Sequence, residues 1–101
     1  MALTVRPFRR PGVAVAAPAA AVVGMATGVI VARNQARHGL LLTLVSAGQV
    51  AFGLGQDAVL NAGINLFGQG AVWEMDELSF TTEPISAVAD EADRVLAIQE
   101  F

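Results

Sequence analysis

Two short runs of alternating apolar residues organise the chain, and the glycine-containing turn Ser46-Ala47-Gly48 separates them. One face of the two runs consists of Leu40, Leu42, Leu44, Val50, Phe52 and Leu54. A period of two indicates strands, and runs of about six residues have the usual strand length but are too short for an independently stable helix. Residues 37–54 therefore predict a β-hairpin with a buried leucine-rich face.

Further short apolar runs recur about every eight to twelve residues, with glycine or acidic turns between them. We predict strands at residues 27–32, 64–67, 71–75, 77–80, 85–89 and 94–100. Such spacing is typical of β-sandwiches and small barrels. The predicted fold class is all-β, with a small antiparallel β-sandwich or jelly-roll-like barrel over residues 27–101. A helix over residues 85–98 is the main alternative, because residues 91–98 contain good helix formers.

Residues 1–26 are predicted to form an extended basic and apolar N-terminal arm that lies along other subunits. Its prolines favour extended backbone, and its small side chains permit close approach to another chain. Residues 13–32 are uncharged, so a transmembrane helix and a signal peptide are alternatives. The stretch is rich in alanine and contains neither leucine nor phenylalanine, which makes it a weak membrane span. A membrane partner is therefore not expected.

Composition limits the chain to one small domain with tails. A chain of 101 residues can bury a core but has little surplus stability. It contains no cysteine, which excludes a disulfide-stapled scaffold and a thiolate metal site. Lysine and tyrosine are also absent, and His38 is the single histidine. Few side chains therefore remain for enzymatic chemistry.

Charge is divided unequally along the chain. Residues 1–56 carry five arginines and no acid, whereas residues 57–101 carry all nine acids and a single arginine, Arg94. Complementary charges of this kind can set the register between copies of a chain or between different proteins. The alternative is that the two halves satisfy each other within one molecule. The sequence leaves both interpretations open.

Candidate chemical groups are few. His38 has no second histidine or cysteine with which to form a zinc site. Glu74 and Asp76 would share one side of a strand, where two carboxylates could bind calcium or act as an acid–base pair, with Glu77 beside them. A solvated strand face is the simpler interpretation, since no nucleophile accompanies them. The acidic residues Asp90, Glu91 and Asp93 similarly favour a solvated turn.

Nucleic-acid and phosphate binding find little support. The glycines match no phosphate-binding pattern and are predicted to serve turns and bulges. Arg6, Arg9 and Arg10 lack the lysines and interleaved aromatic residues of a nucleic-acid-binding surface, so contact with acidic protein is the preferred use. Trp73 is expected in the core, although tryptophan is also enriched at interfaces. No cofactor, metal or specific nucleic acid is expected.

A series of short motifs in residues 33–101 resembles a group of small virion proteins of tailed bacteriophages. The matching segments are Arg33-Asn34-Gln35-Ala36-Arg37, Val50-Ala51-Phe52-Gly53, Gly63-Ile64-Asn65-Leu66, Gly70, Ile85-Ser86-Ala87-Val88 and Val95-Leu96-Ala97-Ile98. The resemblance implies a compact antiparallel β-sandwich that acts on the phage particle as a homotrimeric capsid cement or decoration protein. The sequence departs from the group in lacking a proline before Gly70 and in its long alanine-rich arm.

We therefore expect a non-enzymatic virion protein that bridges capsid subunits, with the major capsid protein or other virion subunits, and further copies of itself as a trimer, as partners. Burial of arm valines in grooves of the neighbours would supply the contact, at about 1.5 kcal/mol or more for each buried valine. The expected contact residues are Arg6, Phe8, Arg9, Arg10, Val13, Val15, Val22 and Val23 in the arm, and Arg37 and Trp73 in the domain. A membrane-anchored small bacterial protein and a metal-dependent enzyme are the alternatives.

Overall fold

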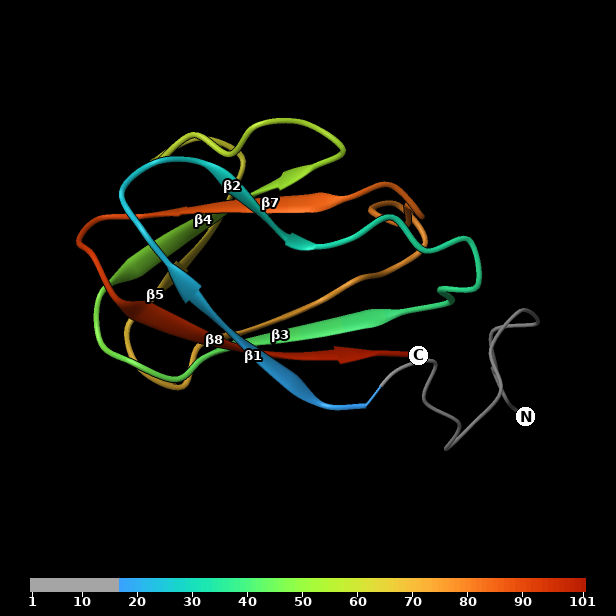
Figure 1. Ribbon diagram of the computed structural model, residues 1–101, viewed down its shortest axis with the longest axis horizontal. Coiled ribbons are helices and arrows are strands. Elements are labelled where there is room, and N and C mark those ends of the chain that lie inside the picture. The colour runs from blue at the N-terminus through green and yellow to red at the C-terminus, as the bar shows by residue number, and fades with distance from the viewer. Residues whose placement is uncertain (1–16) are drawn as a thin grey trace.

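The computed structural model describes residues 17–101, which form an all-β domain. The strands are β1 (Ala19–Val23), β2 (Gly28–Val31), β3 (Leu40–Leu44), β4 (Gln49–Leu54), β5 (Ile64–Phe67), β6 (Val72–Glu74), β7 (Ile85–Ala89) and β8 (Arg94–Glu100). They make two four-stranded antiparallel sheets, in the orders β1-β8-β3-β6 and β2-β7-β4-β5. Figure 1 shows the two layers edge-on, and the predicted all-β fold class is confirmed.

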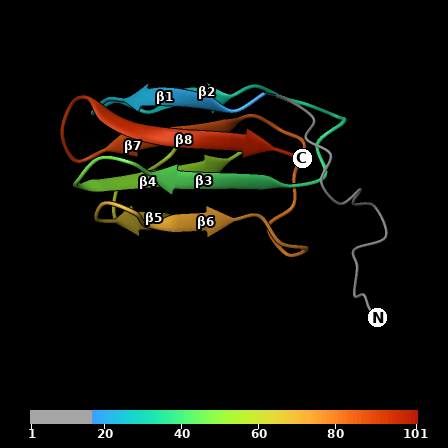
Figure 2. The same cartoon turned by 90° about the horizontal axis from the view of Figure 1, so that it is seen from below.

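Strands that are distant in the sequence lie side by side in both sheets. β1 pairs with β8, with Ala19 opposite Ile98, and β2 pairs with β7, with Gly28 opposite Ala87. The first two strands therefore join partners near the other end of the chain. Figure 2 looks onto the β1-β8-β3-β6 sheet and shows the second sheet behind it. Each sheet therefore includes a pairing between an early and a late strand of the described residues.

The core lies between the sheets and contains one of the two alternating residue sets from each strand. Leu42, Leu44 and Leu96 from one sheet are fully buried, as are Val50 and Ile85 from the other. Alternation places these side chains on one face of each pleated strand. Each fully buried side chain of this size contributes about 1.5–3 kcal/mol relative to exposure. The prediction that the leucines of residues 40–44 share a buried face is confirmed.

The predicted hairpin at residues 37–54 is wrong in its pairing. β3 and β4 form at the expected positions, but they belong to different sheets. β3 pairs with β6 and β8, whereas β4 pairs with β5 and β7. The turn at residues 45–48 thus carries the chain from one layer to the other. Both apolar faces are buried because they meet across the core rather than along one sheet.

Two other boundaries differ from the prediction. β1 lies inside the segment predicted as an arm, where it pairs over five residues with β8. The part of that segment before residue 17 lies outside the described residues. Residues 77–80, predicted as an edge strand, form a turn held by Asp76 and Ser79. Residues 85–89 and 94–100 are strands, so the helical alternative is wrong.

Candidate functional site

Arg37 is the most buried charged residue that the structure describes, with an exposed fraction of 1%. Its Nε donates to Glu100 Oε2 at 2.7 Å. The other two nitrogens donate at 2.8–2.9 Å to the backbone oxygens of Ala32, Thr81 and Glu83. A guanidinium has five donors in a rigid fork, which suits the simultaneous binding of several oxygens. Arg37 therefore ties the loop before β3 to the loop before β7 and to the end of β8.

This position of Arg37 corrects its predicted role as an interface residue. The side chain is enclosed within its own domain and is not offered to a neighbour. A buried charge requires a paired and fully hydrogen-bonded environment, and the loops around Arg37 supply one. The part of the sandwich that contains Arg37 and the last residue, Phe101, is called the Arg37 end below (right-hand side of Figure 1). The opposite part, with the β7–β8 turn, is called the Asp90 end.

The outer side of the β1-β8-β3-β6 sheet is nearly free of charge. Its side chains come from alternate positions of the four strands, and we call it the open face. The open face comprises Ala20, Val22, Leu41, Thr43, Val72, Glu74, Val95, Ala97 and Gln99. The strand register aligns Ala20, Ala97, Thr43 and Val72 in one row across all four strands.

Several open-face side chains are accessible to a partner. Val22 has an exposed fraction of 67% and Val72 one of 55%. A shallow hollow of about 140 Å³ lies at the Arg37 end of this face, lined partly by Pro18, Leu41 and Gln99. In antiparallel sheets with one solvated face, apolar residues that point to the core usually alternate with polar residues on the solvated face. Glu74 is the single charged residue of the open face, so this surface departs from that pattern.

The outer side of the second sheet is covered by the chain itself. There Ala51 and Val88 are buried beneath Ala58, with Leu60 packed against them. Thr27 Oγ1 accepts a hydrogen bond of 2.9 Å from the Ala58 backbone, which fixes the covering loop. Gly53 is needed under this loop, because a Cβ there would lie 2.7 Å from the Asp57 carbonyl oxygen. Only one of the two outer sheet surfaces is thus covered by described residues.

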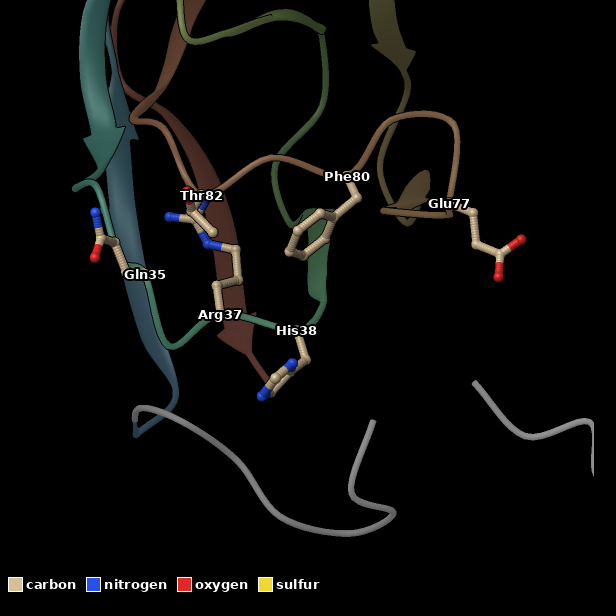
Figure 3. Close-up of a pocket in the computed structure, with 6 residues that line it drawn as sticks. All are labelled: Gln35, Arg37, His38, Glu77, Phe80 and Thr82. Carbon is tan, nitrogen blue, oxygen red and sulfur yellow. The ribbon is translucent and has the colours of Figure 1, made fainter. Parts of the chain in front are cut away.

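A groove of about 510 Å³ opens at the Arg37 end, lined by Gln35, Arg37, His38, Glu77, Phe80 and Thr82. Figure 3 shows Phe80 directed into the space between the two lining segments, with Glu77 at the outer side. The groove lies between the loop that precedes β3 and the loop that follows β6. His38 thus lines an open surface.

The carboxylates considered from the sequence do not converge. Glu74 is the last residue of β6, whereas Asp76 lies beyond the strand in a turn. Asp76 Oδ1 accepts hydrogen bonds from the Ser79 hydroxyl and from the Leu78 and Ser79 backbone, and the Ser79 bonds hold the pKa of Asp76 below its ordinary value. Within residues 17–101, no group of three or more His, Asp or Glu residues could hold a metal ion.

The other acidic cluster is divided between two roles. Asp90 binds Arg94 at 3.0 Å and accepts the Gln49 backbone N–H at 3.1 Å, and these contacts lower the pKa of Asp90. Glu91 is exposed and 3.7 Å from Arg94. Asp93 adopts a left-handed conformation with φ of 64° in the turn before β8. These three acidic residues lie in the β7–β8 turn, where the sequence predicted a solvated turn.

The remaining predicted interface residues fall in three places. Trp73 is half-buried and faces the core, with its ring centroid 6.1 Å from that of Phe52. Val22 lies on the open face, but Val23, with an exposed fraction of 2%, belongs to the core of its own domain and cannot enter a neighbour. The other predicted arm residues lie outside the described residues, namely Arg6, Phe8, Arg9, Arg10, Val13 and Val15.

Sequence reasoning missed both the open face and the groove. A signal for the open face was present, because residues 40–44 and 95–98 contain small or apolar residues in both alternating sets. Strands with two uncharged faces are typical of strands covered on both sides. The groove had no such signal, since its two lining segments are about forty residues apart in the sequence and meet only in the folded domain.

Comparison with family models, with characterised proteins and with solved structures gives no match. The resemblance to phage virion proteins therefore stays a prediction. Among residues 17–101 no helix is long and apolar enough to cross a membrane. The described part of the uncharged stretch at residues 13–32 instead contains β1 and β2.

Proposed function

We propose that this chain is a structural virion protein of the capsid cement or decoration type, which stabilises a phage head by bridging neighbouring subunits. The open face carries the proposal. It presents exposed valines on a nearly uncharged sheet surface, while the equivalent surface of the other sheet is covered by the chain's own loop. Apolar surface of this kind marks protein–protein contact sites. The resemblance of residues 33–101 to virion proteins supports the same assignment.

The size of the open face suits repeated contacts in a lattice of capsid subunits better than a single pairwise protein–protein interface. Strands about 4.8 Å apart, with about 3.3 Å per residue, give the face an area of roughly 300 Å². A stable pairwise interface buries about 800 Å² on each partner. The face alone thus supports a weak contact. Repetition over many copies on a particle multiplies weak contacts into firm attachment.

Complementary charges help to orient the chain on its neighbours in the proposed assembly. The arginines of residues 1–16 and the acidic second half of the chain are complementary in sign. In the proposed assembly, a homotrimer sits on the major capsid protein and the N-terminal residues contribute additional contact area, with Val13 and Val15 as the apolar components. Complementary charges steer such contacts and set their register.

The test is co-sedimentation with particles in lysates of the cells that produce the protein. We expect the wild-type chain in the particle fraction and Val72→Lys mostly in the soluble fraction, because a lysine would place a charge on the exposed edge strand of the open face. Val59→Lys is the matched control, since Val59 is 60% exposed on the loop that covers the other sheet. Wild-type protein found only in the soluble or membrane fraction would contradict the proposal.

A further inference from the structure

The groove at the Arg37 end combines an apolar interior with one acidic lining residue, Glu77. Phe80 is 39% exposed in it, and Leu78, in the same loop, is 99% exposed. Glu77 stands at the outer side of the groove (Figure 3), and Asp76 precedes it in the turn that the Asp76–Ser79 hydrogen bonds hold. A ligand that suits this groove has an aromatic or aliphatic side chain flanked by positive charge.

The described domain lacks the cations to match its acids. Residues 17–101 carry three arginines and nine acids, a net charge of 3 − 9 = −6. All three arginines already have acidic partners, Arg33 with Glu83, Arg37 with Glu100, and Arg94 with Asp90 and Glu91. Residues 1–16 contain three further arginines and no acid. The positive charge that complements the groove is thus concentrated at the N-terminus.

Chain connectivity brings this positive charge to the correct end. β1 begins at Ala19 opposite Ile98, close to the Glu100 that binds Arg37, so the described part of the chain begins at the Arg37 end. Residues 6–10 have the sequence Arg-Pro-Phe-Arg-Arg. The nine Cα-to-Cα steps from Phe8 to Ala17 can span up to about 30 Å when extended. The segment can therefore reach the groove without crossing the sandwich.

We propose that the groove is the docking site for residues 6–10 of the same chain. The Phe8 ring packs against Phe80, and the flanking arginines lie against Asp76 and Glu77. Attachment through a short connection gives this segment a millimolar effective concentration at its own groove, which exceeds that of a second copy in dilute solution. The contact does not depend on the proposed virion function, because it forms in the isolated protein.

Disulfide trapping tests the contact, since the chain has no natural cysteine. Pro7→Cys keeps Phe8 and all three arginines, and Gln35→Cys places the second thiol in the lining of the groove. Under mild oxidation of the full chain, we expect an internal disulfide in the monomer. The control pair is Pro7→Cys with Val45→Cys, because Val45 is 45% exposed next to the far end of β3. We expect closure of the control to be about tenfold slower or more.

Charge and aromatic contacts are tested on the same cysteine pair. Glu77→Arg and Phe8→Ala should each slow closure at least severalfold. Glu91→Arg makes the same charge change on an exposed residue at the Asp90 end and should leave the rate unchanged. Trp73 fluorescence reports whether each variant is folded. Equal rates for the two cysteine pairs, rates insensitive to Glu77 and Phe8, or a disulfide formed mainly between two chains would overturn the proposal.

Discussion

Arg37 shows how one residue can connect three segments that are distant in sequence. Its guanidinium binds two backbone oxygens in the loop before β7, one after β2 and the carboxylate of Glu100. The described residues contain no buried side-chain nitrogen or oxygen atom without a hydrogen-bond partner. The loops of the Arg37 end thus depend on this side chain, since removing it leaves several buried acceptors unpaired.

Arg37→Ala should lower the free energy of unfolding by about 3–5 kcal/mol, the usual cost of removing one partner of a buried ion pair. Arg33→Ala is the matched control, because the Arg33–Glu83 pair is about half exposed and 3.8 Å long. Exposed pairs contribute about 0–1 kcal/mol. Urea unfolding followed by Trp73 fluorescence provides the measurement. If both variants lowered the free energy of unfolding equally, the buried contacts of Arg37 would not be the ones that stabilise the domain.

Asp90 predicts an acid-dependent loss of stability. Its hydrogen bond from Arg94 and that from the Gln49 backbone depress its folded pKa below the ordinary value of 3.8. Because the folded pKa is the lower one, the stabilisation is present at higher pH and is lost as the pH falls through the folded pKa. Asp90→Asn should reduce the slope of unfolding free energy against pH below about pH 4.

Asp93→Asn is the control for this acid titration. Asparagine tolerates the left-handed backbone that Asp93 adopts, so the substitution removes a charge from the same turn without straining it. We expect it to lower the free energy of unfolding at neutral pH less than Asp90→Asn does, because the Asp90 carboxylate binds both Arg94 and the Gln49 backbone. Asp76 also has a lowered pKa, so Asp90→Asn should remove part of the slope and not all of it. An unchanged slope for Asp90→Asn would contradict this account.

At the scale of the element, β1 shows that a weak local signal can still specify a strand. Ala19–Val23 has little apolar bulk, and three of its five residues are alanine. It becomes a strand because β8 offers it a complete antiparallel edge, with Val22 opposite Val95. Val23 then enters the core while Val22 faces outward. Pairing, rather than intrinsic propensity, determines this element.

The adjacent valines of β1 give a direct test of its integration. Val23→Ala should lower the free energy of unfolding by about 1.5–3 kcal/mol, the value of a buried valine. Val22→Ala should change it by less than about 0.5 kcal/mol, as for other surface positions. Both variants lose the same β-branched side chain, so the difference measures burial alone. Thermal unfolding by circular dichroism checks it, and equal effects would show that β1 is not part of the core.

The whole molecule is dominated by pairings between the first and last strands. β1 and β8 join the two ends of the described chain, and β2 with β7 does the same in the other sheet. The acidic second half and the basic first half are also brought together by this topology, for example in the Arg37–Glu100 pair. The interpretation that the two halves satisfy each other within one molecule is thus confirmed for Arg37 and Arg33.

This topology predicts slow folding. Sheets built from non-local pairings fold in milliseconds to seconds, whereas domains with local contacts fold in microseconds to milliseconds. Trp73 is the single tryptophan and contacts Phe52 in the opposite sheet, so its fluorescence reports the closing of the two layers. Stopped-flow refolding should show this signal changing on the slow scale. A change complete within microseconds would contradict the expected role of the terminal strands.

The sequence by itself determined seven of the eight described strands and the inward faces of residues 40–44 and 49–54, but it missed β1 and wrongly predicted a strand at residues 77–80. The alternation in residues 40–44 and 49–54 and the turns near Gly48 and Gly68 required only local chemistry, and glycine suits the positive φ angles of 105° and 85° found there. The all-β class followed from this spacing. Side chains alternate between the two faces of a strand, so the inward-facing set can be predicted from the sequence of that strand alone.

Only the tertiary structure decided which strands pair and which surfaces remain open. A short turn can join strands of one sheet or carry the chain to another sheet, and the apolar pattern of β3 and β4 fits both arrangements. The same applies to Arg37, whose four oxygen partners come from three separate segments, and to the groove, whose two sides meet only after folding. Pairing depends on contacts between distant residues, and the period of one strand contains no information about its partner.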